Sequence, residues 1–327
     1  MGAEMNSEQL KKLHMWPPIS PSYSTWAKAT SNRLGGLYYA DEEDPFFSYM
    51  TWAARSIGDI FGSGLKDSLP RVEVHILDPR ALNAVVAKHG DGYNIGIFQG
   101  LVINAVTAAM KLNSDLPKPV EDLDLLKYAG LILHFVCFHE VTHVLNGHVD
   151  FKRERMLGEL MAEAIEPVDP EWSLISQTLE FDADAGGFQA ATTSLLGLRQ
   201  RRTPSGLRFD RNLPVDEMVG LSQILGRAIA SYFFMTEGQK AIAADAWMRS
   251  HPPAVVRFKS VSALFARLLS MTESLTEHEA DKCIDAFIIG ATEAEIVMGE
   301  GLNRTREPTS YREFSGLEQV LRSMNRL

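Results

Sequence analysis

The sequence predicts a mainly α-helical protein with a small antiparallel β-sheet, an α+β fold. The 327-residue chain is 45% hydrophobic and 23% charged, the ordinary composition of a globular protein with a sizeable core. Two short runs alternate and are rich in β-forming residues, Val72–Leu77 and Tyr93–Phe98. Long apolar segments between helix-breaking residues occupy most of the chain that follows.

The elements are expected in the following order. The first seventy residues predict a helical and irregular wrap, because prolines follow Trp16 and a helix start at Asp41–Pro45 leads into Phe46–Phe61. The two strands come next, separated by the turn signal Gly90-Asp91-Gly92. The predicted helices are Leu101–Met110, Leu125–Val149, Trp172–Leu198, Asp216–Met235, Lys240–Arg249 and Ala254–Met271, followed by an amphipathic helix and a polar tail. The basic, proline-containing stretch Arg199–Pro214 is predicted to be an exposed loop.

The net charge of −10 argues against a nucleic-acid partner. Two cysteines cannot form a disulfide framework, and Cys137 is expected to be a buried free thiol in an apolar helix. The N-terminus lacks the apolar stretch of a secretory signal. No 18 apolar residues run uninterrupted, and Val219–Met235, which contains Gln223 and Arg227, is interpreted as a buried helix. We therefore expect a cytoplasmic protein with no membrane span.

The motif His139-Glu140-Val141-Thr142-His143 is the first candidate for chemistry. Side chains four apart on a helix differ by about 40° after one full turn, so both imidazoles project from one face. Two of the four tetrahedral positions of zinc need that arrangement. Glu140 stands where a carboxylate can take a proton from zinc-activated water. The alternative is a helix that carries two histidines and a glutamate by chance.

The residues before the motif favour the metal. The segment Ala129–Phe138 is apolar and predicts a central, buried helix. Ionisable side chains in such a helix are costly unless they have partners, and a metal ion is one such partner.

Glu180 is the best candidate for a third ligand. The long zincin motif is excluded, because Val149 stands where that motif has another histidine. Asp184 lies four residues after Glu180, on the same helical face, and can accept the other N–H of a ligating histidine. Asp182 is interpreted as part of an exposed acidic face of the helix. The alternative to a ligand role for Glu180 is that it belongs to such a face as well. Small residues that allow close packing on the first helix surround these acids: Ala183, Ala185, Gly186 and Gly187.

The other histidines are not expected to bind the metal. His148 follows His143 by five residues, which on a continuous helix is about 140° away, so it is interpreted as a residue at the helix end near Gly147. His134 is interpreted as a packed histidine. No context supports a role for His14, His75, His89 and His278.

The motif with Gly147-His148, followed by Glu180-Phe181-x-Ala183-Asp184, resembles the gluzincin family of zinc metallopeptidases that includes the CAAX prenyl endopeptidases and the heat-shock protease HtpX. Two further stretches are similar to that family: Asn83-Ala84 with Gly92 and Ile95–Val102, and His251-Pro252-Pro253 with Arg257. Since no clean transmembrane span lies between Asp184 and His251, a soluble member is expected. A weaker likeness links the chain to the phage-exclusion protease Lit.

The resemblance implies a zincin-like core with two active-site helices. It implies that His139, His143 and Glu180 bind one Zn²⁺ per chain, that Glu140 is the catalytic acid and base, and that Asp184 orients a ligand.

For the substrate, the resemblance implies that an edge strand, formed by Ile95, Gly96, Ile97 and Phe98, pairs with an extended peptide. His251 would stabilise the oxyanion, although it could also be a loop histidine before a helix stop. Arg257 is expected to be a structural ion-pair partner.

The predicted function is a zinc-dependent endopeptidase acting on a peptide or protein substrate. Residues 71–300 would form the catalytic domain, with the wrap of residues 1–70 before it and a tail of residues 301–327 after it. Two alternatives stay open: a catalytically silent metal-binding or protein-interaction module on the same scaffold, and a hydrolase specific for one protein target or a non-peptide amide. The wrap and the Arg199–Pro214 stretch are where a lid or pro-segment would be sought.

Overall fold

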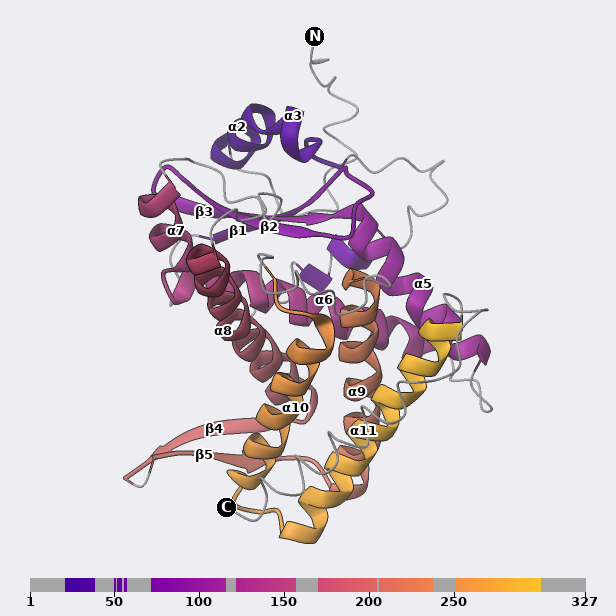
Figure 1. Cartoon of the computed structure of the whole chain (residues 1–327). Helices are drawn as coiled ribbons and strands as arrows, with labels where there is room; N and C mark the ends of the chain where they lie inside the picture. The colour runs from indigo at the N-terminus through magenta and orange to yellow at the C-terminus, as the bar shows by residue number, and fades with distance from the viewer. Residues whose placement is uncertain are drawn as a thin grey trace. The chain divides into compact units, whose positions relative to one another are not determined.

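The computed structural model of the chain (Figure 1) describes residues 21–38, 50, 52–54, 56–57, 72–115, 122–156, 170–204, 206–237 and 251–300. The predicted helix at Lys240–Arg249, the tail of residues 301–327 and most of the N-terminal wrap lie outside these residues. The chain divides into two compact units. Unit 1 comprises Met1–Thr107 and Glu140–Ile165, and unit 2 comprises Ala108–His139 and Glu166–Leu327.

Unit 1 contains a three-stranded sheet in the order β1-β3-β2. Strand β3 (Gly92–Phe98) pairs in parallel with β1 (Val72–Leu77) and antiparallel with β2 (Ala84–His89). The prediction of an antiparallel sheet is therefore wrong for these strands, since the sheet is mixed. Strands β1 and β3 were predicted from the sequence, whereas β2 was not.

The prediction that Ile95, Gly96, Ile97 and Phe98 form an edge strand is also wrong. These residues belong to β3, whose backbone pairs with β1 on one side and with β2 on the other. A strand with both sides paired has no row of free N–H and C=O groups to offer to an extended peptide.

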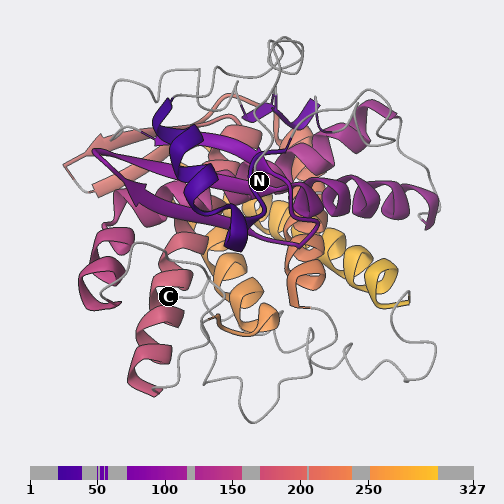
Figure 2. The ribbon, with the colours of Figure 1, turned by 90° about the horizontal axis from the view of Figure 1, so that it is seen from above.

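One face of this sheet packs against two short helices, α2 (Pro21–Ala29) and α3 (Ser31–Leu34). Figure 2 shows α2, in indigo, lying over the strands. The Tyr23 hydroxyl donates a 2.7 Å hydrogen bond to the Ile95 carbonyl. The buried side chains of this layer are Tyr23, Trp26, Ala27, Leu34, Leu77, Val85, Ala87 and Phe98. Their alternation along each strand gives the sheet its apolar face.

The helices of the second half confirm the mainly helical prediction. Helix α10 packs against α8, α9 and α11, and α9 packs along α11 (Figure 1). The bounds are α5 (Gln99–Asp115), α6 (Asp122–Leu145), α7 (His148–Met156), α8 (Pro170–Leu195), α9 (Val215–Glu237), α10 (Ala254–Ser270) and α11 (Glu277–Glu300).

Aromatic rings hold the helices of unit 2 together. Their edge-to-face and stacked contacts have centroid separations between 4.7 and 6.2 Å. These separations are typical of favourable ring pairs. The rings come from α6, α8, α9, α10 and α11 and belong to Phe135, Phe188, Tyr232, Phe233, Phe258, Phe265 and Phe287.

The predicted loop Arg199–Pro214 is instead a β-hairpin of β4 (Leu198–Thr203) and β5 (Gly206–Arg211). Its exposed arginines do not prevent strand pairing, because their side chains are accessible to solvent. Arg201 pairs with Glu273 and Asp210. Phe209, which is fully buried, anchors the ribbon through backbone hydrogen bonds with Met271 and Glu273.

Two helices are long and apolar enough to cross a membrane by length and composition, within Lys127–Leu145 and Val215–Thr236. The core helix of a soluble protein meets the same criterion. In the first of them 78% of the apolar window is buried inside the protein.

Helices α9 and α11 approach each other closely because each carries a glycine that faces the backbone of the other helix. A Cβ atom at Gly226 would lie 2.0 Å from the Phe287 carbonyl oxygen, and one at Gly290 would lie 2.0 Å from that of Gln223. Beside this contact Glu293 accepts hydrogen bonds from Gln223 and Arg227.

We expect Gly226→Ala to lower the melting temperature, because the added methyl group must push α11 away. The free energy of unfolding should fall by about 1–3 kcal/mol, as in other overpacked cores. Gly220→Ala, on the same helix with nothing within 4 Å of the new Cβ, is the matched control. It should stabilise the protein by up to about 1 kcal/mol through helix propensity. Equal melting temperatures of the two variants in thermal denaturation would contradict the close approach.

Candidate metal site

The two candidate histidine ligands lie on α6, a helix that is almost wholly apolar around them. Helix α6 buries Ile132, Leu133 and Phe135 completely, and His139, Glu140 and His143 are each at most 3% exposed. Three ionisable groups in such surroundings require partners that offset the loss of water. The division between the two units falls inside α6, between His139 and Glu140, but the helix itself is continuous. Its regular turn therefore fixes the spacing of His139 and His143.

Helix α8 packs so closely against α6 at Gly187 that the two backbones are in contact. A Cβ atom on Gly187 would lie 2.7 Å from the Phe135 carbonyl oxygen and 2.9 Å from the backbone nitrogen of His139. The small residues predicted to allow close packing therefore include one position where only glycine fits. This contact brings the acidic residues of α8 to His139.

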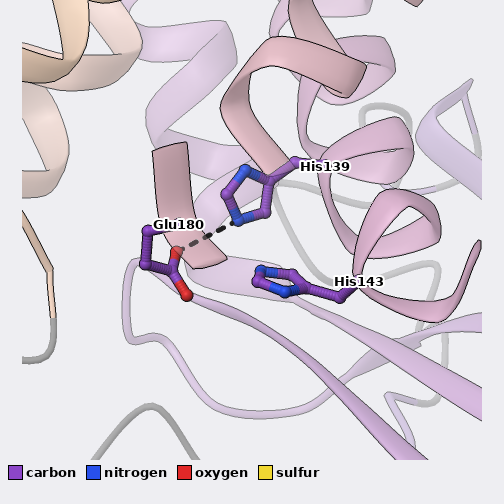
Figure 3. A group of neighbouring side chains, drawn as sticks. All are labelled: His139, His143 and Glu180. Atoms are coloured by element: carbon purple, nitrogen blue, oxygen red, sulfur yellow. Dashed lines mark ion pairs between the residues drawn. The ribbon is translucent and has the colours of Figure 1, made fainter. Parts of the chain in front are cut away.

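His139, His143 and Glu180 form one buried group (Figure 3). Each offers a ligand atom, and these atoms all lie within 4.8 Å of one another. His139 Nε2 is 3.3 Å from Glu180 Oε2. In Figure 3 a nitrogen of each imidazole faces the Glu180 carboxylate. The three ligands chosen from the sequence thus come together in the structure.

Asp184 lies beside the Nδ1 atom of His139, and Arg257 forms an ion pair with Asp184. Asp184 Oδ1 lies 3.0 Å from His139 Nδ1. The Arg257 guanidinium donates two hydrogen bonds to the Asp184 carboxylate, both 2.7 Å long, and Arg257 is 6% exposed. It also stacks over the Phe233 ring, 5.1 Å from the centroid. Arg257 is therefore a structural ion-pair partner, as predicted.

The pKa shifts follow from these contacts. Burial alone would lower the pKa of His139, but the carboxylates of Asp184 and Glu180 outweigh it and raise the pKa to about 10. Burial raises the pKa of Asp184, whereas the Arg257 guanidinium outweighs burial and holds that pKa below its usual range. The two acids thus favour positive charge at His139, either a proton or a metal ion.

His251 also lies near the group. Its Nε2 is 3.5 Å from Glu180 Oε2, and its side chain is 29% exposed. The residue precedes α10, the helix that carries Arg257. This position places a partly exposed imidazole beside the buried carboxylate.

His148 lies at a helix end next to Gly147, as predicted, but the prediction that it points away from His143 is wrong. The angle of about 140° between His143 and His148 holds only on a continuous helix. In the structure α6 ends at Leu145 and α7 begins at His148. Gly147 between them has a left-handed φ of 73°. The chain therefore turns, and His148 Nδ1 comes to 3.0 Å from His143 Nδ1. His148 is 6% exposed and is not in the three-residue group.

His134 is a packed histidine, as predicted. Its ring stacks on Phe138 with centroids 4.8 Å apart. Burial lowers the pKa of His134 to about 4, so the ring is neutral at physiological pH. Cys137 is buried and forms no disulfide, as predicted.

The donor set is one that could hold a metal ion, and zinc provides a comparison for its geometry. At Zn–N and Zn–O bond lengths of about 2.0–2.2 Å, two ligand atoms of a tetrahedral site lie about 3.3–3.6 Å apart. The 3.3 Å between His139 Nε2 and Glu180 Oε2 agrees with that separation. Two imidazoles and one carboxylate are also the ligand types of catalytic zinc, which keeps a fourth position open. A buried His-His-Glu group that could hold a metal ion is therefore present.

No family model, no curated protein and no solved structure matches the chain. The chemistry of the site consequently has to be inferred from its own residues.

Arg257→Met should destabilise the protein by about 3–5 kcal/mol, because it leaves the Asp184 carboxylate buried without its strongest partner. The pair should stabilise the protein above about pH 4, and its contribution should decline at lower pH as Asp184 binds a proton. Urea denaturation at pH 7 and at pH 3 would measure both effects.

Arg201→Met, which removes an ion pair whose arginine side chain is 52% exposed, is the control. It should cost about 0–1 kcal/mol. A double variant with Asp184→Asn should recover part of the loss caused by Arg257→Met. Similar costs for Arg257→Met and Arg201→Met would contradict the burial argument.

Proposed function

We propose that the protein is a zinc-dependent endopeptidase of the gluzincin type. The observation that carries the proposal is the buried group of His139, His143 and Glu180 with Glu140 beside the first ligand. A structural zinc site has four protein ligands, whereas this group supplies three from the residues that the structure describes, the number typical of a catalytic site. Glu140 is 3% exposed and follows His139 directly in the chain, a position from which a carboxylate can reach a metal-bound water.

The roles of the residues follow from their chemistry. His139, His143 and Glu180 would hold the ion, and Asp184 would keep the His139 ring in the tautomer that presents Nε2. The zinc ion, when bound, supplies Lewis-acid activation of a water molecule and of the scissile carbonyl. Glu140 would take the proton of the attacking water and deliver it to the leaving amine. His251, partly exposed beside Glu180, would donate a hydrogen bond to the oxyanion.

The substrate in this proposal is a peptide or protein. Strand β3 is not the substrate strand, because both of its sides are paired. In this proposal the protein is cytoplasmic and does not span a membrane. In support, Arg227 of α9 is paired with Glu293 of α11, and its side chain is only 12% exposed. A charged pair between two helices of unit 2 suits packing within a protein better than contact with lipid.

The first test is metal content. The wild-type chain should bind one zinc per chain, measured by elemental analysis after dialysis and by competition with a chromophoric chelator. His143→Ala and Glu180→Gln should each lower the affinity by at least about 100-fold, since each removes a ligand. His278→Ala, at an exposed position of α11, should leave the content unchanged. A wild-type chain that binds no zinc would refute the site.

The second test is hydrolysis. Glu140→Gln should still bind zinc. Its kcat on unfolded casein should fall at least about a thousandfold, because the amide cannot take the proton of the water. Asp182→Asn, which changes an exposed acid on α8, is the control and should keep full activity. Retained activity in Glu140→Gln would contradict its role. Zinc binding by the wild-type chain without cleavage of casein would favour the silent module or a hydrolase with a single protein target.

A further inference from the structure

His148 lies against the second candidate ligand without belonging to the ligand group. His143 Nδ1 and His148 Nδ1 are 3.0 Å apart, the length of a hydrogen bond between ring nitrogens. The two rings meet edge to face, with centroids 5.1 Å apart. Both side chains are at most 6% exposed, so water does not compete freely for this contact.

This contact decides which nitrogen of His143 is available to a metal ion. Since Nδ1 is engaged with His148, Nε2 remains for the group with His139 and Glu180. A neutral imidazole that binds a metal through Nε2 carries its proton on Nδ1 and donates it to an acceptor. His148 Nδ1 then accepts that hydrogen bond and carries its own proton on Nε2.

The backbone between the two histidines is built for this contact. Gly147 has a φ of 73°, a conformation that costs about 1–2 kcal/mol for other residues. Its N–H donates to the Val144 carbonyl, and its own carbonyl accepts from the Phe151 N–H in the first turn of α7. The turn therefore ends one helix and starts the next within three residues, which returns His148 to His143.

A second set of contacts fixes α7 within unit 1. Asp150, two residues after His148, accepts a 2.6 Å hydrogen bond from Lys88 Nζ and a 2.5 Å hydrogen bond from the Tyr93 hydroxyl. Lys88 lies on β2 and Tyr93 on β3. These hydrogen bonds hold the pKa of Asp150 below its usual range, so the anchor is ionised at neutral pH. The first turn of α7 is thus tied to the sheet.

We propose that His148 is a positioning residue of the metal site, which orients His143 by accepting its Nδ1–H while Asp150, Lys88 and Tyr93 anchor α7. The inference rests on the proposed zinc site and extends it. Asp184 does for His139 what His148 does for His143, so each ligating imidazole has its own partner. One partner is a carboxylate and the other a neutral ring.

The experiment compares two substitutions of similar size in the full-length chain. His148→Gln keeps a hydrogen-bond acceptor, whereas His148→Leu removes it. Zinc affinity is measured by chelator competition, and the ligand field by the visible spectrum of the Co²⁺-substituted protein. We expect His148→Leu to weaken zinc binding about 10–100-fold and to change the Co²⁺ spectrum. His148→Gln should stay within about threefold of wild type and keep the spectrum.

Asp150→Ala tests the anchor, with an expected loss of affinity smaller than that of His148→Leu. Circular dichroism of the metal-free proteins checks that each variant is folded, and His148→Met replaces the leucine variant if the latter does not fold.

The outcomes separate the two proposals. Wild-type zinc binding together with unchanged affinity in His148→Leu would overturn the role of His148 and leave the zinc site intact. Equal losses in the glutamine and leucine variants would overturn the hydrogen bond in favour of packing alone. Wild-type affinity in Asp150→Ala would overturn the anchor. A wild-type chain without zinc would refute the zinc site itself, and the role of His148 with it.

Discussion

The chain of contacts from Arg257 through Asp184 and His139 to Glu180 is the constraint around which three helices are arranged. Each of these groups is at most 6% exposed, and isolated charges at such depth would cost several kcal/mol each. Arg257 comes from α10, the two acids come from α8 and His139 comes from α6. The helices must therefore keep their register, because a slip of one residue would separate a buried charge from its partner. The aromatic cluster around them excludes water and strengthens every one of these interactions.

Local periodicity explains why much of the candidate site could be predicted. The spacing of His139 and His143, and that of Glu180 and Asp184, depends only on the turn of an α-helix. That turn is the same in almost every protein. The ion-pair role of Arg257 was expected too, although its partner Asp184 is 73 residues away. The helices of the second half were found for the same reason, since their apolar runs are long and bounded by clear breakers.

The features that could not be predicted depend on contacts between distant residues or on a change of direction. The contact of His148 with His143 was missed because the angular argument holds only on an unbroken helix, and the left-handed φ of 73° at Gly147 ends that helix. The helix end near Gly147 was predicted from the glycine itself, but the direction in which the chain turns after it was not. The central position of β3 follows from pairing with β2, a strand without a strong signal. The arginine-rich β4 was predicted to be a loop because its sequence is strongly charged, and the pairing of Arg201 with Glu273 and Asp210 could not be read from the sequence.

Gly187 has a consequence for the choice of ion. Where α8 touches α6, main chain meets main chain with no side-chain layer between them that could compress or repack. The spacing of the α6 and α8 backbones beside His139 is therefore fixed, whereas the Glu180 carboxylate can still turn about its own side-chain bonds. A group of two imidazoles and one carboxylate would suit an ion with bonds near 2 Å better than calcium, whose bonds are about 2.3–2.6 Å long and which needs six or more oxygen ligands. Uptake of such an ion would therefore involve side-chain movement and no change in the distance between the two helices.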